Sequence, residues 1–348
     1  MILTNKRVVI IGPGAIGGST ACFVAQAGFD VVLVANREET VQKINRDGIR
    51  VSGVKGSHTT KIPAVAKVKD LEGVFDVAFV ATKAWALRET AKELLPFIKE
   101  DGVVVSMQNG ICTDILEEVV GKARTIGCVV GYGATMIERG HLEVTSTGEF
   151  VIGSADGTVS ENVRFAGQAL ESLFPVRITE HILEELYSKL IVNSCITSLG
   201  AVCGIKLGQM MKRRELRRIF LQVIDEAMAV ATAMGIKVPP YGGKLDYYGL
   251  IKKGIVRRLI SHLMLIIVGQ KYKNLKSSSL QSLERGEQTE IDYFNGYISK
   301  KGSQAGVRTP INDQLVKMIK EIEAGKREIG LINIRTLNSD LQRRCPRG

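Results

Sequence analysis

Residues 7–17, RVVIIGPGAIG, decide the fold of the first part of the chain. The apolar β-branched run predicts a buried strand, and the glycine-rich turn after it opens a helical pattern that ends at Gly28. In such a strand–turn–helix unit the first glycine permits the tight turn, the second lets the backbone approach a pyrophosphate, and the third allows close helix–strand packing. The helix N-terminus faces the phosphates with its positive dipole. The turn therefore predicts a dinucleotide site made by Gly12, Pro13, Gly14, Ala15, Ile16 and Gly17.

Two kinds of pattern divide the chain. Up to about residue 180, β-rich runs alternate with helical patterns, which predicts an α/β fold with a doubly wound, Rossmann-type sheet. The predicted strands are 7–11, 31–35, 77–81, 103–107, 125–130, 142–145 and 150–153, with helices at 15–27 and 86–98. Beyond residue 180, helical periodicity covers residues 184–202, 214–234, 254–268 and 279–300. The proline- and glycine-containing stretch 238–243 is expected to be a loop.

These patterns predict a dinucleotide-binding domain at residues 1–180, an all-helical substrate domain at 181–330, and a basic tail at 331–348 with the composition of a disordered segment. With 348 residues, the chain is long enough for two domains without disulfides or metals.

Composition excludes several classes of protein. The chain begins without a secretory signal, and its most apolar later stretch, 259–268, is shorter than the roughly 20 residues of a membrane span, so a buried helix in a soluble, cytoplasmic protein is expected. Six scattered cysteines lack metal-binding spacing and are expected to be reduced and structural. The net charge of +11 could indicate nucleic-acid binding, but the basic residues are dispersed and lack a nucleic-acid motif. Attraction of small anions explains the charge at least as well.

The second predicted strand ends in Asn36-Arg37. An NAD site would usually have an acidic residue here for the ribose hydroxyls, whereas a guanidinium suits the 2'-phosphate of NADP. Glu38 and Glu39 follow directly, and either could serve a ribose if the loop turned differently. Arg37 favours NADPH over NADH, with a solvated surface arginine as the alternative.

Two further pairs of polar residues are candidates for chemistry. Lys83 and Asn109 lie just past the carboxyl ends of consecutive strands, the edge where ligands bind in open parallel sheets, although a lysine at a strand end is often only solvated. Lys189 and Asn193 are four residues apart on one helical face bounded by apolar residues. A partly desolvated ammonium with a depressed pKa is a suitable proton donor.

At this point the chain resembles the ketopantoate reductase family over nearly its whole length, up to about Arg327. Separated motifs carry the resemblance in the family's order: GPGAIG at 12–17, ATKAW at 81–85, QNG at 108–110, KLIVN at 189–193, and SSSLQ at 277–281 continuing to TEID at 289–292. The resemblance implies NADPH-dependent reduction of 2-dehydropantoate (ketopantoate) to pantoate, in pantothenate and coenzyme A biosynthesis.

The resemblance also implies roles for single residues. Lys189 would be the general acid and Asn193 a substrate partner, while Lys83 and Asn109 would hold the nicotinamide ribose and the reacting carbonyl. The corresponding serine, Ser278, binds the substrate carboxylate in the family, Glu290 anchors ligand hydroxyls beside the catalytic lysine, and Ala134 lies against the cofactor. From the residues alone, Glu290 could instead be a helix cap or a solvated side chain. Helical domains of this kind often pair, so a homodimer is a further expectation.

The clearest departure from the family pattern is Thr197, one helical turn beyond Asn193, where a second asparagine is common. The threonine side chain is shorter than a carboxamide and cannot bridge the same two hydrogen-bonding partners. Thr197 is therefore a substrate-binding candidate that leaves the identity of the accepted keto acid open. Two alternatives therefore remain. One is a related reductase of another small branched 2-keto acid. The other is a non-enzymatic NADP-binding regulator, which is disfavoured by the presence of Lys189, Asn193 and Glu290.

Overall fold

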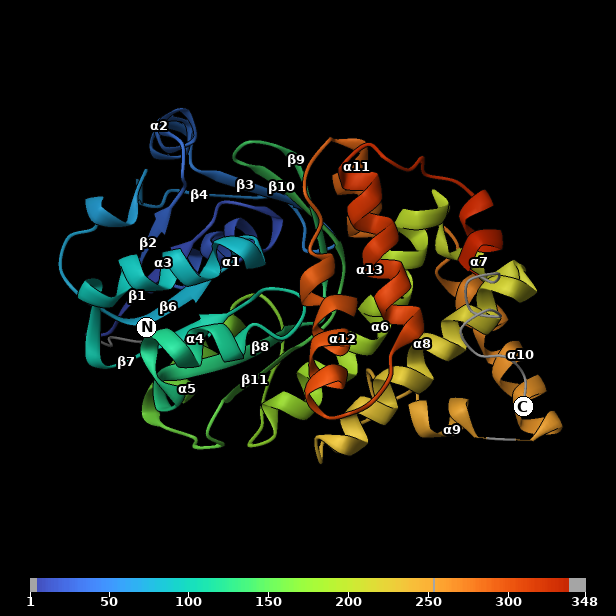
Figure 1. Cartoon of the computed structure of the whole chain (residues 1–348). Coiled ribbons are helices and arrows are strands. Elements are labelled where there is room, and N and C mark those ends of the chain that lie inside the picture. The colour runs from blue at the N-terminus through green and yellow to red at the C-terminus, as the bar shows by residue number, and fades with distance from the viewer. Residues whose placement is uncertain (1–4, 253, 338–348) are drawn as a thin grey trace. The chain divides into compact units, whose positions relative to one another are not determined.

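The computed structural model describes residues 5–252 and 254–337 of the chain (Figure 1). The chain divides into two compact units, the first ending at Leu186 and the second beginning at Tyr187. Each unit has its own core, and the two are described separately below.

The first unit contains an eight-stranded sheet in the order β12-β11-β8-β7-β6-β1-β2-β5. Its strands are β1 (Arg7–Ile11), β2 (Asp30–Val34), β5 (Ala64–Val65), β6 (Phe75–Val80), β7 (Ile98–Ser106), β8 (Thr125–Val130), β11 (Phe150–Ser154) and β12 (Val176–Ile178). Neighbouring strands are parallel except β8 and β11, which are antiparallel. The central strands are buried on both faces, which explains their continuous Val and Ile runs. The predicted Rossmann-type sheet is confirmed.

Five helices accompany this sheet: α1 (Ala15–Gln26), α2 (Glu38–Asp47), α3 (Leu87–Leu94), α4 (Thr113–Val120) and α5 (Glu161–Glu171), with short 3₁₀ turns η1 (Val68–Asp70), η2 (Ala84–Ala86), η3 (Leu95–Phe97) and η4 (Lys122–Arg124). The helix predicted at 86–98 is therefore too long. Pro96 lies in η3, and Ile98 already begins β7.

A second, four-stranded sheet was not predicted. It runs in the order β4 (His58–Thr60), β3 (Ile49–Gly53), β10 (His141–Ser146), β9 (Gly133–Glu138). The strand predicted at 142–145 exists as β10, but it belongs to this sheet and not to the large one. The small sheet packs on α1: a Cβ added at Gly18 would lie 2.5 Å from Leu142 Cδ1.

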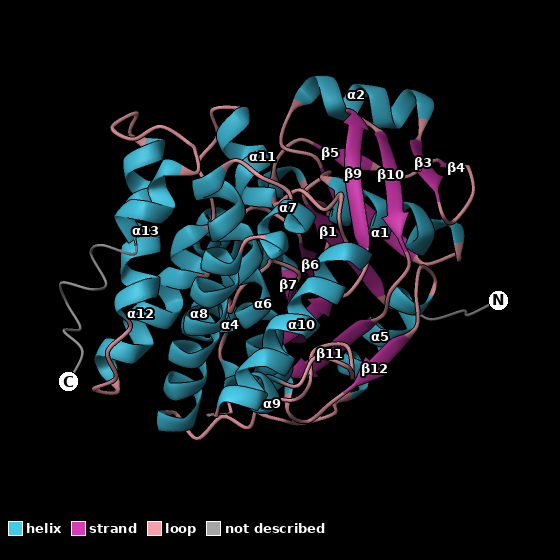
Figure 2. Ribbon diagram, turned by 90° about the vertical axis from the view of Figure 1, so that its right-hand side faces the viewer, coloured by secondary structure: helices cyan, strands magenta, loops and turns pink. Residues whose placement is uncertain are grey.

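The described part of the second unit is helical, as predicted, apart from an isolated bridge between Tyr241 and Leu245 (Figure 2). Its helices are α6 (Ile182–Cys203), which begins before the division between the units, α7 (Leu207–Lys212), α8 (Arg214–Ala233), α9 (Tyr247–Ile251), α10 (Ile255–Lys271), α11 (Ser278–Glu284), η5 (Ile291–Tyr293), α12 (Asn295–Gln304) and α13 (Pro310–Glu323). Residues 238–243 form the predicted loop.

Two expectations for this half were wrong, and a third does not hold for the part of the tail that the structure describes. The helical pattern at 279–300 is not one helix, because Gly286 has a left-handed φ of 69° after α11 ends. The helix predicted to be buried around 259–268 exists as α10 but exposes most of its apolar side chains. In the tail expected to be disordered, residues 332–337 are helical and bury Ile334 and Leu337; residues 338–348 lie outside the described part.

Five of the six cysteines lie within the described residues, and all five are buried thiols: Cys22, Cys112, Cys128, Cys195 and Cys203. Cys345 lies outside the described residues.

Candidate functional site

Four parallel strands of the first unit end at the same level of the sheet, and the candidate cofactor residues follow these strand ends. Ile11 pairs with Val34 on one side and with Val80 on the other, and Val80 pairs with Ser106. Because the strands are parallel, their carboxyl ends meet at one edge of the sheet. The residues that follow them, namely Arg37, Gly12, Lys83 and Asn109, therefore lie in that order along this edge.

The glycine turn has the geometry of a nucleotide cradle. Gly12 has a φ of 109°, and its N–H donates to Val34 O at 3.0 Å. A Cβ on Gly17 would lie 2.1 Å from Gly12 O, so only glycine lets α1 pack this closely on the turn. A Cβ on Gly14 would meet no atom within 4 Å, which leaves open space in front of α1. The first turn of α1 contains no acidic residue, so its N–H groups and dipole suit an anion such as a pyrophosphate.

Arg37 lies at the start of α2 with its side chain exposed. Asn36, directly before it, has a φ of 65°, which turns the chain out of β2 and into α2. The second of the two neighbouring glutamates is engaged elsewhere, because Arg139 Nη1 donates to Glu39 Oε2 at 2.5 Å. This pairing leaves Arg37 better placed than Glu39 for the adenine ribose end of a cofactor.

Lys83 and Asn109 are both half-buried, three residues beyond Val80 and Ser106. The buried side chain of Gln108 connects the two loops that carry them. Its Nε2 donates to Val80 O at 3.0 Å and to Thr82 O at 3.2 Å, while Ser106 Oγ donates to its Oε1 at 2.6 Å. Gln108 is part of the QNG motif, but the sequence assigned it no role; its place between a strand end and Asn109 was the available signal.

Ala134 lies in β9, paired with Val144 of β10 and packed against the core of the first unit. Two residues earlier, the Tyr132 hydroxyl hydrogen-bonds with Ser19 Oγ of α1 at 2.9 Å. Burial raises the pKa of Tyr132 to about 12, so this hydroxyl stays protonated. The pair fixes the start of β9 beside α1, which keeps Ala134 near the glycine turn.

In the second unit, α6 presents the predicted pair. Lys189 and Asn193 are half-buried, whereas their neighbours Leu190, Ile191 and Ser194 are buried. A half-buried face with an ammonium and an amide one turn apart can hold an anionic or carbonyl-bearing ligand.

Thr197 continues the same face and is buried. Its hydroxyl donates to Asn193 O, so the hydrogen bond that this side chain could donate to a ligand is already used within the helix.

The N-terminus of α11 lies against the same helix. A Cβ on Gly200 of α6 would lie 2.8 Å from Ser277 Oγ. Ser277 caps α11, since its Oγ accepts from Leu280 N at 3.2 Å. The predicted ligand-binding serine, Ser278, follows this buried cap and is exposed.

Glu290 is buried at 9% exposure and directly precedes η5, so it is not on one helix with Ser278. Nearby, Asn295 Nδ2 donates to Ser194 O of α6 at 3.1 Å and to Asn312 Oδ1 at 2.9 Å. Asn295 thus holds the segment after Glu290 beside the part of α6 that carries Asn193. Sequence reasoning missed Asn295, because nothing in the sequence indicates which side chains are fully buried.

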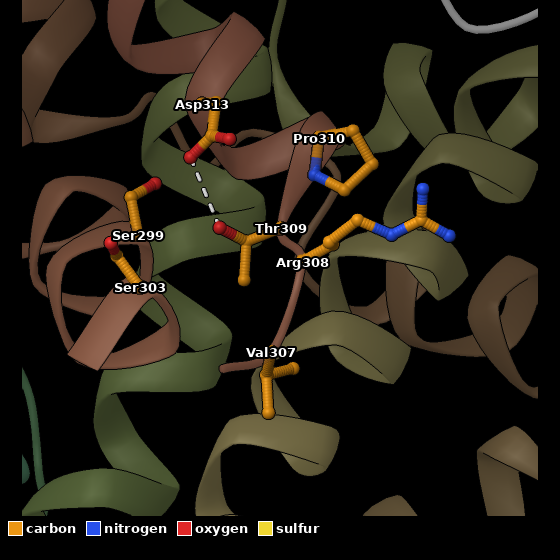
Figure 3. A pocket seen from close by; sticks show the side chains of 7 residues that line it. All are labelled: Ser299, Ser303, Val307, Arg308, Thr309, Pro310 and Asp313. Atoms are coloured by element: carbon orange, nitrogen blue, oxygen red, sulfur yellow. Dashed lines mark hydrogen bonds between the residues drawn. The ribbon is translucent and has the colours of Figure 1, made fainter. Parts of the chain in front are cut away.

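A cavity of about 540 Å³ in the second unit lies elsewhere. Its lining residues are Ser299, Ser303, Val307, Arg308, Thr309, Pro310 and Asp313 (Figure 3). Thr309 Oγ1 donates to Asp313 Oδ1 at 3.0 Å across one wall. None of the predicted site residues lines this cavity.

Among the described residues, no group of three or more His, Cys, Asp or Glu side chains could hold a metal ion. One described helix, α6, is long and apolar enough to cross a membrane, but 83% of its apolar window is buried within the structure. This burial is typical of the core helix of a soluble protein.

A Rossmann-type sheet with a glycine turn at the start of α1 defines a dinucleotide-binding protein. The sequence matches "Ketopantoate reductase PanE/ApbA" over residues 8–157 and "Ketopantoate reductase PanE/ApbA C terminal" over residues 181–323. The chain belongs to the ketopantoate reductase family.

Individual relatives agree with this assignment. The 2-dehydropantoate 2-reductase of Archaeoglobus fulgidus is 29% identical over 323 residues, which cover 92% of this chain and 99% of the relative. A crystal structure of a PanE/ApbA family ketopantoate reductase from Ralstonia eutropha superposes with a TM-score of 0.79 at 26% identity, covering 93% of this chain and all of that one. A D-mandelate dehydrogenase structure with NADH and anilino(oxo)acetate has a TM-score of 0.79 at 22% identity over 92% of this chain and 99% of that one, which shows the same fold.

Proposed function

We propose that this oxidoreductase reduces 2-dehydropantoate to pantoate with NADPH, in the cytoplasm, as a step of pantothenate and coenzyme A biosynthesis. The observation that carries the proposal is the half-buried Lys189–Asn193 pair on α6, in a chain that matches both halves of a keto acid reductase family. The basic net charge of +11 suits a substrate that carries a carboxylate.

The first unit holds the cofactor in this proposal. Gly12, Gly14 and Gly17 make room for the pyrophosphate, with the N-terminus of α1 behind it. Arg37 binds the 2'-phosphate of NADPH by charge-assisted hydrogen bonds, since Glu39 is engaged by Arg139. Lys83 and Asn109 hold the nicotinamide end, and Ala134 packs against it. When bound, NADPH supplies a hydride to the keto carbon.

The second unit supplies the substrate groups. Lys189 Nζ donates a proton to the carbonyl oxygen as the hydride arrives, which avoids a free alkoxide, and the resulting amine regains its proton from solvent. Asn193 donates a hydrogen bond to the substrate, and the exposed Ser278 hydroxyl binds its carboxylate. Glu290 directly precedes the segment held by Asn295 and anchors ligand hydroxyls near Lys189.

One observation favours a second candidate, reduction of another small branched 2-keto acid. The Thr197 hydroxyl donates to the backbone of Asn193, so this position offers the substrate no donor and less reach than the asparagine it replaces. A substrate with an apolar group at this point would fit better than one with a hydroxyl.

Initial rates of NADPH oxidation on a panel of 2-keto acids test the proposal. We expect the highest kcat/KM with 2-dehydropantoate, and a lower value with the same acid lacking its terminal hydroxyl. A higher kcat/KM with the hydroxyl-free acid would instead support the second candidate. Absence of turnover with every keto acid, together with NADPH binding, would support a non-enzymatic regulator.

A further inference from the structure

A chain of hydrogen-bonded side chains connects α8, α13, α12 and α6 inside the second unit. Asn312 Nδ2 donates to Glu226 Oε2 at 2.7 Å, at the α8 end of the chain. Asn295 Nδ2 of α12 then donates to Asn312 Oδ1 at 2.9 Å and to Ser194 O of α6 at 3.1 Å. Asn295, Asn312 and Ser194 are all fully buried. The chain therefore ends on α6 directly beside Asn193, the proposed substrate partner.

The orientation of the Asn295 amide is fixed from the Glu226 end of this chain. Because the Glu226 carboxyl oxygen accepts from the amide nitrogen of Asn312, the amide oxygen of Asn312 is turned toward Asn295. Asn295 must answer with its nitrogen, since both Asn312 Oδ1 and Ser194 O are acceptors. A flipped amide would place its oxygen against two other oxygens.

This orientation leaves buried polar atoms without partners. Within the described part of the chain, Asn295 Oδ1, Ser194 Oγ and Ser299 Oγ are buried and make no hydrogen bond. Unpaired buried polar atoms cost free energy, and native proteins contain few of them. Asn295 already contacts Ser194, and Ser299 lies one turn further along α12, so the three atoms belong to neighbouring side chains.

The cavity of Figure 3 provides a source of water beside these atoms. Ser299 lines the cavity, and so does Ser303, one turn further along α12. The cavity volume of about 540 Å³ is large enough for several water molecules, each of which occupies about 30 Å³ in the liquid. Because Asn295, Ser299 and Ser303 are spaced four residues apart, one face of α12 extends from the cavity to the unpaired oxygen of Asn295.

We propose that the second unit binds ordered water at Asn295 Oδ1, Ser194 Oγ and Ser299 Oγ, and that this water fixes the substrate face of α6. Water both donates and accepts, so one molecule can donate to the amide oxygen and also bond to a hydroxyl. Buried waters typically make about three such bonds and are part of the folded structure. A metal ion would match these three neutral atoms poorly.

The positioning role rests on the proposed function, in which Asn193 binds the substrate. Ser194 is the next residue of α6, so restraining its carbonyl group and its hydroxyl also restrains the backbone of Asn193. Asn295 supplies the restraint on the carbonyl group, and the water supplies the restraint on the hydroxyl.

A high-resolution crystal structure tests the water site directly. We expect density for a water molecule about 2.5–3.0 Å from Asn295 Oδ1, with a second contact to Ser194 Oγ or Ser299 Oγ. In the Ser194→Ala/Ser299→Ala variant this water would keep one partner of the three, so its density should disappear. Absence of the density in wild type, beside an ordered Asn295, would overturn the proposal.

Steady-state kinetics tests the positioning role. Ser194→Ala retains the backbone carbonyl that Asn295 binds and removes only the hydroxyl. We expect KM for 2-dehydropantoate to rise about 2–10-fold, the effect of one hydrogen bond, while the Kd for NADPH stays unchanged. Ser198→Ala is the matched control, because Ser198 is equally buried on α6 but its hydroxyl donates to Ser194 O within the helix. Equal KM values for the two variants, at equal Tm, would overturn the positioning role.

The two tests also separate this proposal from the proposed function. If wild type reduces no 2-keto acid, the proposed function fails, and the crystal structure alone decides whether the water site exists. If 2-dehydropantoate is reduced but the water density is absent, only the water site fails.

Discussion

Lys189 is the residue whose loss should separate chemistry from cofactor binding. Replacement by Ala removes the proposed proton donor, so we expect kcat to fall by about 10²–10⁴-fold, the usual contribution of general acid catalysis. The Kd for NADPH, measured by fluorescence titration, should change little. Lys300→Ala, at an exposed lysine of α12, is the control. Turnover within a few-fold of wild type would remove Lys189 from the mechanism.

Arg37 should determine the preference between the two nicotinamide cofactors. Hydrogen bonds between charged groups contribute about 1.5–3 kcal/mol, so Arg37→Ala should weaken NADPH binding by roughly 10–150-fold. NADH has no 2'-phosphate and should bind with nearly unchanged affinity. Parallel titrations with both cofactors measure the difference, and an equal loss for the two would contradict the assignment.

Gln108 is expected to act as a positioning residue for Lys83. A carboxylate cannot donate to Val80 O and Thr82 O, so Gln108→Glu should release the loop that carries Lys83 and lower kcat by about tenfold or more. Ser106→Ala is the control, because it removes one bond to Gln108 but leaves both donations intact. Similar kcat losses in the two variants, at similar Tm, would show that Gln108 is only structural.

At the scale of elements, Glu226 joins α8 to the N-terminus of α13. Its carboxyl group accepts from Ile311 N at 2.8 Å, from Asn312 N at 3.0 Å and from Asn312 Nδ2 at 2.7 Å. Burial raises the pKa of Glu226 from 4.5 to about 7, despite these three donors. Asn312 in turn accepts a hydrogen bond from Asn295, and Asn295 donates a hydrogen bond to the backbone of α6.

The raised pKa makes the contribution of Glu226 to stability depend on pH. Between pH 4.5 and about 7, the folded chain holds a proton that the unfolded chain has lost, so the free energy of unfolding should fall as pH rises through this window. The full loss is about 3 kcal/mol, reached above pH 7. Urea unfolding at pH 5 and pH 8 measures it. The wild-type decrease should shrink in Glu226→Gln; an unchanged decrease would assign it to other groups.

Elements with a clear hydrophobic pattern could be predicted from the sequence. Elements that depend on contacts with distant parts of the chain could not. The bounds of β1 and β8 follow from their buried β-branched runs, and α6 and α8 follow from their periodicity. The sheet formed by β3, β4, β9 and β10 escaped prediction because its strands are short or partly exposed; Met136 and Ile137 of β9 face solvent. The exposure of α10 was missed because an apolar pattern does not reveal whether its own chain covers it.

The same division applies to the candidate site. The place of Arg37, Lys83 and Asn109 at one edge of the sheet could be predicted, since parallel strands place their carboxyl ends together. Their roles, and those of the Lys189–Asn193 pair, stay predictions. The supporting side chains, Gln108 and Asn295, could not be assigned, because their hydrogen bonds connect segments distant in the sequence.

For the whole molecule, the excess of basic residues should affect how an anionic substrate arrives. Screening by salt weakens long-range attraction, so we expect kcat/KM for a 2-keto acid to fall several-fold between about 20 mM and about 500 mM salt. The value of kcat should change much less, because it does not include the encounter. A methyl ester of the same acid is the control and should show little salt dependence. Equal sensitivity of acid and ester would exclude steering by the net charge of +11.

The alignment of strand ends in the first unit has a practical consequence for engineering. The pairs Val34 with Ile11, Ile11 with Val80, and Val80 with Ser106 place each ligand contact on a separate short connection. The connection after β2 could therefore be exchanged for one from an NAD-specific enzyme without disturbing those after β6 and β7. If Arg37 sets coenzyme choice as proposed, we expect this local graft to adapt the reductase to a different cellular redox pool while leaving catalysis intact.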